Sequence, residues 1–375
     1  MNRYSLRLYD EELLTFSLES VGLSGMLAHV LNVNESRRNV FPLDLEVTDE
    51  GMMEWLKKRV LPRSRANSDA ILSTLGLSAN NTKGIIDTSK GLSLNDSYWI
   101  VPFDFDGVFK DYNLYKNRFS DEIAHIALTG EKRPIESFKV SPELTTQGTL
   151  RKAWHNAGGD GIFLYKGGSS NKGREPVNEF LASQIAERMG LHTVHYDLDN
   201  WNDIVISKCK LFTGIDISFI PIGRIIKNRN IQACLDYYEE ISKEAVEELK
   251  SMLVFDAVIY NEDRHFGNFG ILRDNHSGIV LGPAPIFDNA LSLFNYAMPS
   301  DYKNLAEYAK TRSNPYGISY EAICREVMGP KQRNQLRRLI GFHFARNPIV
   351  DLPEEHLTAI EKQVDMRIKK LLSLS

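Results

Sequence analysis

Three residues with oxygen-bearing side chains lie in and after the segment Asn-Glu-Asp-Arg-His-Phe-Gly-Asn at 261–268. Asp263 and Asn268 are five positions apart, and Asp288 ends Pro-Ile-Phe-Asp twenty-five positions after Asp263. Phosphoryl transfer from a nucleotide requires one carboxylate that orients the attacking hydroxyl. It also requires an amide oxygen and a second carboxylate that hold metal ions against the phosphates. A lone Asp-x4-Asn is usually turn chemistry, but the complete string predicts a kinase.

The flanking elements explain how these residues meet. Apolar residues recur at helical spacing over 242–260, so this predicted helix leads the chain directly into the motif. Two apolar segments within 268–281 enclose a turn-rich pentapeptide, which predicts a hairpin. The hairpin returns the chain toward its start, so we expect Asn268 and Asp288 to share a magnesium ion. Mg²⁺ accepts a few hard oxygen ligands from protein and the rest from phosphates and water.

The remaining residues of the motif have open interpretations. His265 either orders the loop or approaches the nucleotide phosphates; a catalytic base or metal ligand is the alternative. Arg264 is expected to pair with a carboxylate or a phosphate. Gly267 allows the backbone to turn tightly.

The preceding part of the chain has a β-rich pattern. Residues 144–154 and 161–166 are predicted strands, and a helix is predicted from Pro176 to about Met189. The proline favours the first turn of that helix, and a glycine follows its last turn. A short strand is predicted over 203–209.

Four residues of this region are candidates for nucleotide contact. Thr146 and Gly148 lie in a hydroxyl-rich run that could bind phosphates through backbone N–H groups, although a plain turn fits the run equally well. Lys208 and Cys209 end the predicted strand over 203–209, where the chain leaves it, and could offer backbone groups to adenine. A plain strand-to-loop exit is the alternative.

Composition excludes several classes of protein. The chain has 375 residues and a net charge of −4 without a long Lys/Arg run, which argues against direct nucleic-acid binding. The three cysteines form no CxxC pair, so a zinc site is not expected and a reducing compartment is. We find no signal peptide and no apolar run long enough for a membrane span. We therefore expect a cytoplasmic protein without a membrane partner.

The order of elements predicts an α+β protein with a two-lobed, protein-kinase-like fold, in which the small lobe is β-rich and the large lobe helical. We place an α+β N-terminal region of unassigned role at 1–135, beginning with a β-hairpin over 3–19. The small lobe is placed at 136–212 and the helical large lobe at 213–375, with a final helix from 353 to 372.

The string Asn-Glu-Asp-Arg-His-Phe-Gly-Asn-Phe-Gly-Ile-Leu, followed by Pro-Ala-Pro-Ile-Phe-Asp, resembles the catalytic region of HipA-like kinases. These are bacterial serine/threonine protein kinases, and many act as toxins of toxin–antitoxin systems. The resemblance covers residues 140–375. It implies ATP and Mg²⁺ as cofactors, a protein substrate, and an antitoxin or DNA-binding partner.

The resemblance also implies roles for individual residues. Asp263 corresponds to the catalytic aspartate, and Asn268 and Asp288 correspond to the magnesium ligands. Lys166, at the end of an apolar strand, corresponds to the lysine that reaches the nucleotide phosphates, and Glu179 on the following helix to its ion-pair partner. A solvated strand end and a solvated helix face are the respective alternatives.

The chain departs from the family in two respects. It has no GxGxxG loop, and residues 1–135 do not match the N-terminal region of HipA. Relatives that phosphorylate themselves do so near the phosphate loop, where this chain has Thr145, Thr146 and Thr149. Two other functions stay open: a phosphoinositide or small-molecule kinase, because the motif also resembles the catalytic loop of phosphoinositide kinases, and a non-catalytic module that binds a partner.

Overall fold

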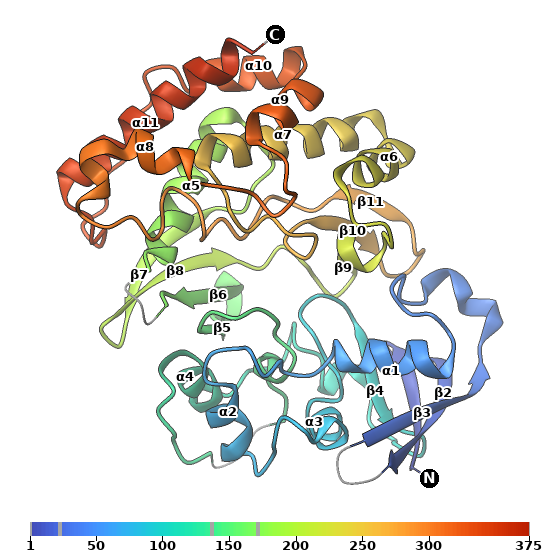
Figure 1. Cartoon of the computed structure of the whole chain (residues 1–375). Helices are drawn as coiled ribbons and strands as arrows, with labels where there is room; N and C mark the ends of the chain where they lie inside the picture. The colour runs from blue at the N-terminus through green and yellow to red at the C-terminus, as the bar shows by residue number, and fades with distance from the viewer. Residues whose placement is uncertain (1, 22–24, 136–138, 170–172, 375) are drawn as a thin grey trace. The chain divides into compact units, whose positions relative to one another are not determined.

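The computed structural model describes residues 2–21, 25–135, 139–169 and 173–374 (Figure 1). Helices mix with several small antiparallel sheets, which confirms the predicted α+β class. The predicted boundary between residues 135 and 136 falls beside residues 136–138, which lie outside the described residues. The chain divides into two compact units. Unit 1 comprises Met1–Lys166, Thr213–Ile220 and Leu272–Leu281, and unit 2 comprises Gly167–Phe212, Pro221–Ile271 and Gly282–Ser375.

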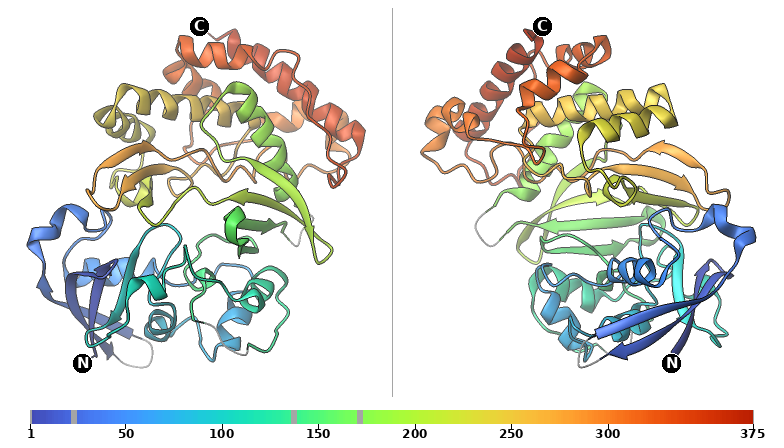
Figure 2. Two further views of the ribbon diagram at one scale, coloured as in Figure 1. Left: turned by 180° about the vertical axis from the view of Figure 1, so that it is seen from behind. Right: turned by 45° about the vertical axis from the view of Figure 1, so that its right-hand side comes forward.

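Unit 1 begins with an antiparallel four-stranded sheet of order β3-β2-β1-β4. Its strands are β1 (Asn2–Leu8), β2 (Glu11–Val21), β3 (Gly25–Val33) and β4 (Tyr98–Pro102). The first two strands form the hairpin predicted at the start of the chain, with Leu6 opposite Leu14. The sheet buries one of its faces against α1 (Asp49–Lys57), to which Trp55 and Leu56 belong (Figure 2).

Helix α1 starts at a side-chain cap. The Thr48 hydroxyl accepts a hydrogen bond from the Gly51 N–H at 3.0 Å, and two acidic residues follow in the first turn. The other helices of unit 1 are α2 (Ser68–Thr74), α3 (Thr82–Ser89) and α4 (Asp121–Thr129), with short 3₁₀ turns at Glu35–Val40, Phe109–Asp111, Pro142–Leu144 and Gly158–Asp160.

Strands β5 (Lys152–Asn156) and β6 (Ile162–Gly167) form an antiparallel hairpin in which Lys152 lies opposite Lys166. The predicted strand over 144–154 is therefore confirmed only in its last residues. A buried ion pair explains the difference, because Glu143 forms a salt bridge with Arg65 and also accepts the Trp154 N–H at 2.7 Å. These contacts hold the residues before β5 in an irregular conformation.

Strands β9 (Ile217–Pro221), β10 (Gly270–Asp274) and β11 (Val280–Pro283) form a sheet of order β11-β10-β9. The hairpin predicted around the 274–278 turn is confirmed by β10 and β11. Within unit 1, the Arg273 guanidinium donates to the carbonyl oxygens of Phe41 at 2.6 Å and Asn39 at 2.5 Å. This buried side chain therefore joins the segment 272–281 to residues near the start of the chain within the same unit.

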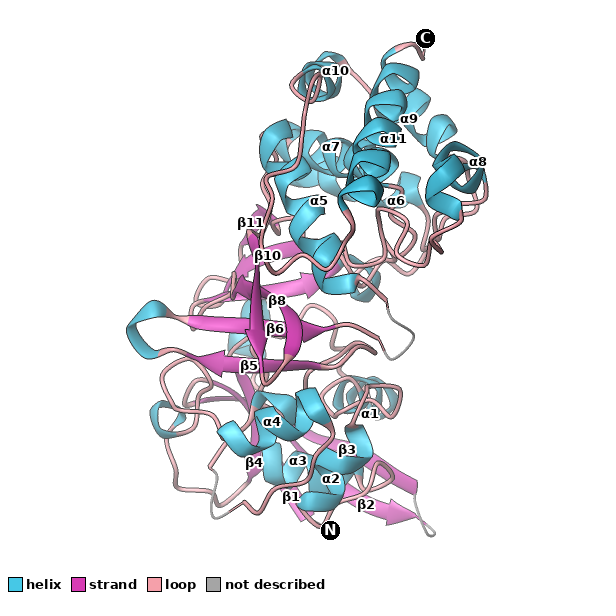
Figure 3. Ribbon diagram, turned by 90° about the vertical axis from the view of Figure 1, so that its left-hand side faces the viewer, coloured by secondary structure: helices cyan, strands magenta, loops and turns pink. Residues whose placement is uncertain are grey.

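Unit 2 is mainly helical, and α7, α9 and α11 pack together in it (Figure 3). Its helices are α5 (Glu175–Met189), α6 (Ile231–Ile241), α7 (Lys243–Ile259), α8 (Leu305–Lys310), α9 (Tyr320–Val327), α10 (Pro330–Arg337) and α11 (Glu354–Leu372), with 3₁₀ turns at Ile222–Arg224 and Asp301–Asn304. The helices predicted over 176–189, 242–260 and 353–372 correspond to α5, α7 and α11.

Two strands of unit 2, β7 (Tyr196–Trp201) and β8 (Ile204–Lys210), pair as an antiparallel hairpin with Tyr196 opposite Cys209. Strand β8 confirms the short strand predicted over 203–209. Among the residues that the structure describes, no helix is long and apolar enough to cross a membrane.

Candidate active site

The guanidinium of Arg264 joins the loops of the candidate site. Its Nε and Nη2 donate to the Asp256 carboxylate on α7 at 3.0 and 3.1 Å. Its Nη1 donates to the carbonyl oxygens of Asn268 and Phe287 at 2.9 and 2.5 Å, and its Nη2 also donates to Asn289 Oδ1 at 2.5 Å. One side chain therefore fixes the residues around Asn268 to those on either side of position 288.

Burial governs the electrostatics of this arrangement. The side chains of Arg264 and Asp256 are 0% and 5% exposed. Burial alone lowers the pKa of Arg264, but contact with Asp256 more than offsets it, so the pKa is raised above its ordinary value. The guanidinium stays charged, and a buried charge needs such a complete set of partners.

The backbone around Asp263 is fixed by short-range hydrogen bonds. The Asp263 N–H donates to Asn261 Oδ1 at 3.0 Å, and the Asp263 carbonyl accepts from the His265 N–H at 2.7 Å. The same carbonyl accepts from Asn268 Nδ2 at 2.9 Å. Asn261 in turn donates to the Asp256 carboxylate at 3.0 Å, so the loop is tied to the helix that precedes it.

Asn268 and Asp288 are the expected metal ligands. Because Nδ2 of Asn268 bonds to the Asp263 carbonyl, the amide presents Oδ1 on its other side. Asp288 has a positive φ of 58°, which Asp tolerates better than most residues, and its N–H donates to the Tyr196 hydroxyl at 3.1 Å. The backbone carbonyls of Asn268 and Phe287 both accept from Nη1 of Arg264. These two carbonyl oxygens therefore lie no farther apart than the sum of two hydrogen bonds, which brings the segment of Asn268 close to that of Asp288.

Glu179 is fully buried on α5, and its Oε2 accepts the N–H of Asn289 at 3.0 Å. This contact ties α5 to the residue that follows Asp288. A solvated helix face, the alternative for Glu179 from sequence, is wrong because the side chain is 0% exposed.

His265 is exposed, and its ring packs against the following backbone. Its Nδ1 accepts the Gly267 N–H at 3.0 Å, and a Cβ on Gly267 would lie 2.7 Å from the ring carbon Cε1. A larger residue at position 267 would therefore displace the exposed His265 ring. The geometry corresponds to the expectation that His265 orders the loop.

Strain is concentrated around the same loops. Helix α7 ends at Tyr260, whose φ of 51° is more usual for glycine, and Leu293 and Phe294 also have positive φ. The Tyr260 and Phe294 rings pack 5.1 Å apart. Such conformations persist only where neighbouring contacts determine them, and they occur preferentially at functional sites.

The candidates in unit 1 lie around the β5–β6 hairpin. Lys166 is 5% exposed, so the solvated strand end considered from sequence is wrong. The Thr146 hydroxyl donates to the Pro142 carbonyl at 2.7 Å and accepts from the Trp154 indole at 3.0 Å. Gly148 has a φ of 95° and lies close to Lys152, whose Nζ donates to the Gln147 carbonyl at 3.1 Å.

Lys208 and Cys209 lie at the end of β8 in unit 2. Lys208 Nζ is 3.9 Å from the Asp199 carboxylate, and Cys209 is buried opposite Tyr196. Because Tyr196 accepts the N–H of Asp288, the end of β8 is linked to that residue by one intervening side chain.

Sequence reasoning missed Asp256, Asn289 and Tyr196. Asp256 had a detectable signal, because a lone acidic residue inside the apolar stretch Leu-Val-Phe-Asp-Ala-Val of a helix needs a buried partner. The other two residues act through contacts across the fold, and neither has a distinctive neighbouring pattern.

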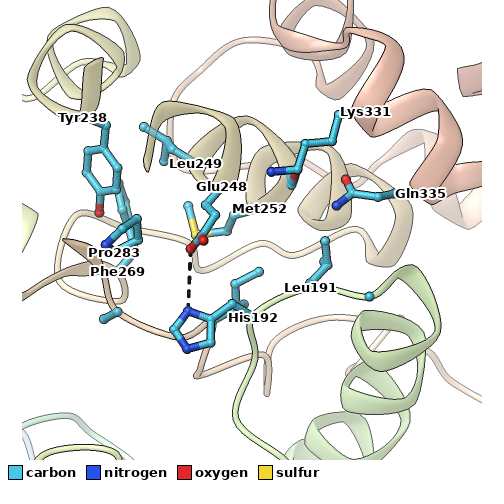
Figure 4. A pocket seen from close by; sticks show the side chains of 14 residues that line it. Leu191, His192, Tyr238, Glu248, Leu249, Met252, Phe269, Pro283, Lys331 and Gln335 are labelled. Atoms are coloured by element: carbon cyan, nitrogen blue, oxygen red, sulfur yellow. Dashed lines mark ion pairs between the residues drawn. The ribbon is translucent and has the colours of Figure 1, made fainter. Parts of the chain in front are cut away.

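A cavity of about 180 Å³ lies elsewhere in unit 2 and contains none of the predicted site residues (Figure 4). Phe269 and Ile286 line it, together with the ion pair of His192 and Glu248 at 3.5 Å. Phe269 directly follows Asn268, and Ile286 lies two residues before Asp288. The cavity wall therefore includes residues that adjoin the two expected metal ligands in sequence.

No family model and no curated protein matches this sequence. Solved structures do match, and one of them shares its fold with nearly the whole chain. The chain is similar to HipA of Shewanella oneidensis MR-1, solved in a toxin–antitoxin complex of HipA, HipB and operator DNA. The TM-score is 0.59 at 13% identity, over 98% of this chain and 97% of that chain.

A second solved structure is the proinflammatory kinase CtkA of Helicobacter pylori, with a TM-score of 0.49 and 19% identity over 60% of this chain and 92% of that chain. The likeness to HipA confirms, at the level of the fold, the resemblance that the sequence motifs indicated. It extends over residues 1–135, where the sequence showed no match to HipA.

Proposed function

We propose that this protein is an ATP-dependent serine/threonine protein kinase of the HipA type. The observation that carries the proposal is the Arg264 arrangement, which holds the Asp263–Asn268 loop and the segment containing Asp288 together in a fold similar to that of HipA. The buried guanidinium binds one carboxylate, one side-chain amide oxygen and two backbone carbonyls, and so fixes the backbone beside both proposed metal ligands.

Each residue has a proposed role. Asp263 orients the substrate hydroxyl in line with the γ-phosphate and accepts its proton. Asn268 Oδ1 and the Asp288 carboxylate hold Mg²⁺. Binding and positioning, rather than covalent chemistry by the protein, supply most of the catalysis in phosphoryl transfer.

The residues present fit a magnesium ion. Among the described residues, no group of three or more His, Cys, Asp and Glu side chains could hold a metal, as a dedicated zinc or calcium site would require. Mg²⁺ in kinases needs only one or two protein carboxylates with substrate phosphates and waters. The hydrogen bond from Asn268 Nδ2 leaves a hard oxygen, Oδ1, for such an ion. When bound, Mg²⁺ would neutralise charge on the phosphates.

Further residues are proposed to contact the nucleotide. Lys166 would bind its phosphates with Glu179 as partner, and the backbone of Gly148 and Thr146 would cover them. His265 would lie toward the phosphates, and the backbone of Lys208 and Cys209 would meet adenine.

The wider biology is also a proposal. We propose a protein substrate, an antitoxin or DNA-binding partner, a toxin-like role in growth regulation and a cytoplasmic location, with residues 136–212 and 213–375 acting as the two kinase lobes. The HipA structure contains HipB and operator DNA, which supports a partner of that kind.

Incubation of the full chain with labelled ATP and Mg²⁺, followed by mass spectrometry, tests the proposal. Phosphate incorporation into the chain itself or into lysate proteins is expected. Asp263→Ala and Asp288→Ala are each expected to lower it by roughly 10²–10⁴-fold, because orienting and charge-stabilising groups contribute that much.

Asp236→Ala on α6 is the matched control, because it removes an exposed carboxylate whose contact is within its own helix. Normal turnover in either Asp263→Ala or Asp288→Ala would refute the assignment. Parallel assays with a phosphoinositide and an aminoglycoside identify the acceptor class. Label transfer to one of these and not to protein would replace the proposed substrate.

A further inference from the structure

A second and larger cavity, of about 690 Å³, lies in unit 2 among α8, α9 and α11. Figure 3 shows these three helices on the same side of the helical region. Four cationic side chains line it: Lys310, Arg312, Arg367 and Lys370. Only one carboxylate, that of Glu321, is among the lining residues that the structure describes. Outside the lining, Glu307 pairs with Lys310 and Glu262 with Arg312, so the four cations are matched by three carboxylates and one positive charge is in excess.

Arg367 is the fixed part of this lining, since only 3% of its surface is exposed. Its Nε donates to the Ala257 carbonyl at 2.8 Å, and its Nη1 donates to Glu321 Oε1 at 2.5 Å. Its Nη2 is buried and has no hydrogen-bond partner among the described residues. A buried guanidinium nitrogen without an acceptor costs free energy, so the contacts of its other nitrogens hold Arg367 in place and keep its positive charge beside the cavity.

The excess charge arises at Glu321. The Glu321 carboxylate contacts Arg367 and also Lys370 Nζ at 2.6 Å, so two cations share one anion. Burial raises the pKa of Glu321, but the two cations outweigh it and lower the pKa to about 2. The N-terminal end of α9 also borders the cavity, and the partial positive charge of a helix N-terminus favours anions.

The cavity contacts the loop that carries Asp263. The Tyr320 hydroxyl donates to the Asn261 carbonyl at 2.7 Å, and Arg312 Nη1 pairs with the Glu262 carboxylate at 3.1 Å. Asn261 and Glu262 immediately precede Asp263. A ligand held by Arg312 therefore lies one side chain away from the proposed catalytic loop.

We propose that this cavity binds a phosphate monoester dianion, carried by a phosphorylated serine or threonine side chain of a protein that docks at the catalytic loop. The role as a substrate-recognition site rests on the proposed kinase function, whereas the binding itself does not.

The chemistry favours a phosphate monoester over other anions. Glu321 already occupies one donor of Arg367 and the Lys370 ammonium, so a second monoanionic carboxylate would add little. A dianion with three acceptor oxygens can instead use the exposed ammonium groups of Lys310 and Lys370 together with the Arg312 guanidinium, all of which line the cavity. A nucleic-acid backbone carries only one charge per phosphate and would need an extended basic surface, which a single cavity does not provide.

Calorimetry on the full chain tests the proposal, with a saturating non-hydrolysable ATP analogue present to occupy the nucleotide site. The probes are the blocked tripeptide Gly-phosphoserine-Gly, its unphosphorylated form and inorganic phosphate. The phosphorylated tripeptide is expected to bind and the unphosphorylated form is not. Lys370→Gln and Lys310→Gln, both at exposed side chains, are each expected to weaken binding roughly two- to fivefold, the value of one solvent-exposed ion pair.

Lys369→Gln is the matched control, because Lys369 is the neighbouring residue on α11, pairs with Asp365 and does not line the cavity. Lys369→Gln is expected to bind the phosphorylated tripeptide as tightly as the unchanged protein does.

Equal affinity for both tripeptides, or an equal loss of affinity in Lys369→Gln, would overturn the inference. Tighter binding of inorganic phosphate than of the tripeptide would assign the site to the free ion and overturn the docking role. Competition by a DNA 10-mer would assign it to nucleic acid. Absence of binding by the ATP analogue itself would count against the kinase function and not against this site.

Discussion

Arg264 donates to five acceptor atoms on four residues that lie four to twenty-five positions away in the sequence, and it is the best single indicator of a prepared site. Its sequence context predicted a carboxylate or phosphate partner, and the buried Asp256 carboxylate confirms the first of these. The pairing with Asn289 could not be predicted, because it depends on how the chain returns after the β10–β11 hairpin. The sequence thus predicts that a charged residue such as Arg264 has an oppositely charged or polar partner. It does not predict which residue that partner is.

Replacing Arg264 by leucine is expected to lower the free energy of unfolding by about 3–5 kcal/mol, because the Asp256 carboxylate would stay buried without a counter-ion. Urea unfolding measures the change. The control is Arg312→Gln, which breaks the partly exposed pair with Glu262, whose side chains are 19% and 25% exposed, and should cost about 1 kcal/mol or less. Similar losses in both variants would show that the buried pair has no special role.

Glu321 gives unit 2 a specific dependence on pH. Its folded-state pKa is lowered from 4.5 to about 2 by Lys370 and Arg367, against the opposing effect of burial. The stabilisation is therefore complete above the unfolded-state pKa and is lost as pH falls from about 4.5 toward 2. Glu321→Gln should be less stable than the unchanged protein at neutral pH, and the two urea midpoints should converge near pH 2. A difference that is constant with pH would contradict this.

At the scale of elements, the helices with strong periodicity and clear ends were predicted to within a residue or two. Helix α5 begins at a Glu-Pro pair and ends at Gly190 with a φ of 75°, as the sequence indicated. The residues Asn-Asn-Thr-Lys-Gly at 80–84 have the composition of a loop, yet they contain the start of α3, because the Asn81 side chain accepts the Gly84 N–H at 2.8 Å and caps the helix. Asn serves equally as a turn former and as a helix cap, and local composition does not distinguish the two.

Ser242 separates α6 from α7 and therefore positions the helix that leads to the candidate site. It is both the C-cap residue of α6 and the N-cap residue of α7. In the second role its hydroxyl accepts a hydrogen bond from the Ala245 N–H at 3.0 Å. Ser242→Ala should lower stability by about 1 kcal/mol, whereas Ser242→Asp, which retains a capping oxygen, should change it little. Thermal unfolding of the two variants tests the prediction. Equal midpoints for both would mean that the cap does not stabilise α7.

For the whole molecule, the likeness to HipA at 13% identity shows that the fold tolerates replacement of most side chains. A fold class follows from the order and periodicity of elements, which is why the α+β class could be predicted without close relatives. The composition of unit 1 could not be predicted. It includes residues 213–220 and 272–281, and only tertiary contacts show that these segments belong with residues 1–166.

Arg273 makes this division testable, because it lies on β10 and bonds within unit 1 to residues more than two hundred positions earlier. Only 4% of its surface is exposed, and it donates to the Phe41 and Asn39 carbonyls and to Gly278 at 2.8 Å. Arg273→Ala would leave buried carbonyls without donors, at a cost of about 1–3 kcal/mol for each one that water does not reach. Hydrogen exchange of the β1–β4 amides should accelerate accordingly, while the amides of α7 keep their protection.

The control for this experiment is Arg229→Ala, which removes an exposed arginine that bonds to the Gly223 carbonyl within unit 2. It should leave the exchange of the β1–β4 amides unchanged. A fragment of residues 1–166 lacks Arg273 altogether and should show the same loss of protection as Arg273→Ala, or a larger one, because it also lacks the Ile215 carbonyl that accepts the Tyr9 and Ser97 hydroxyls. If the fragment exchanged as slowly as the intact chain, the late segments would be dispensable, and unit 1 would be a domain of contiguous sequence.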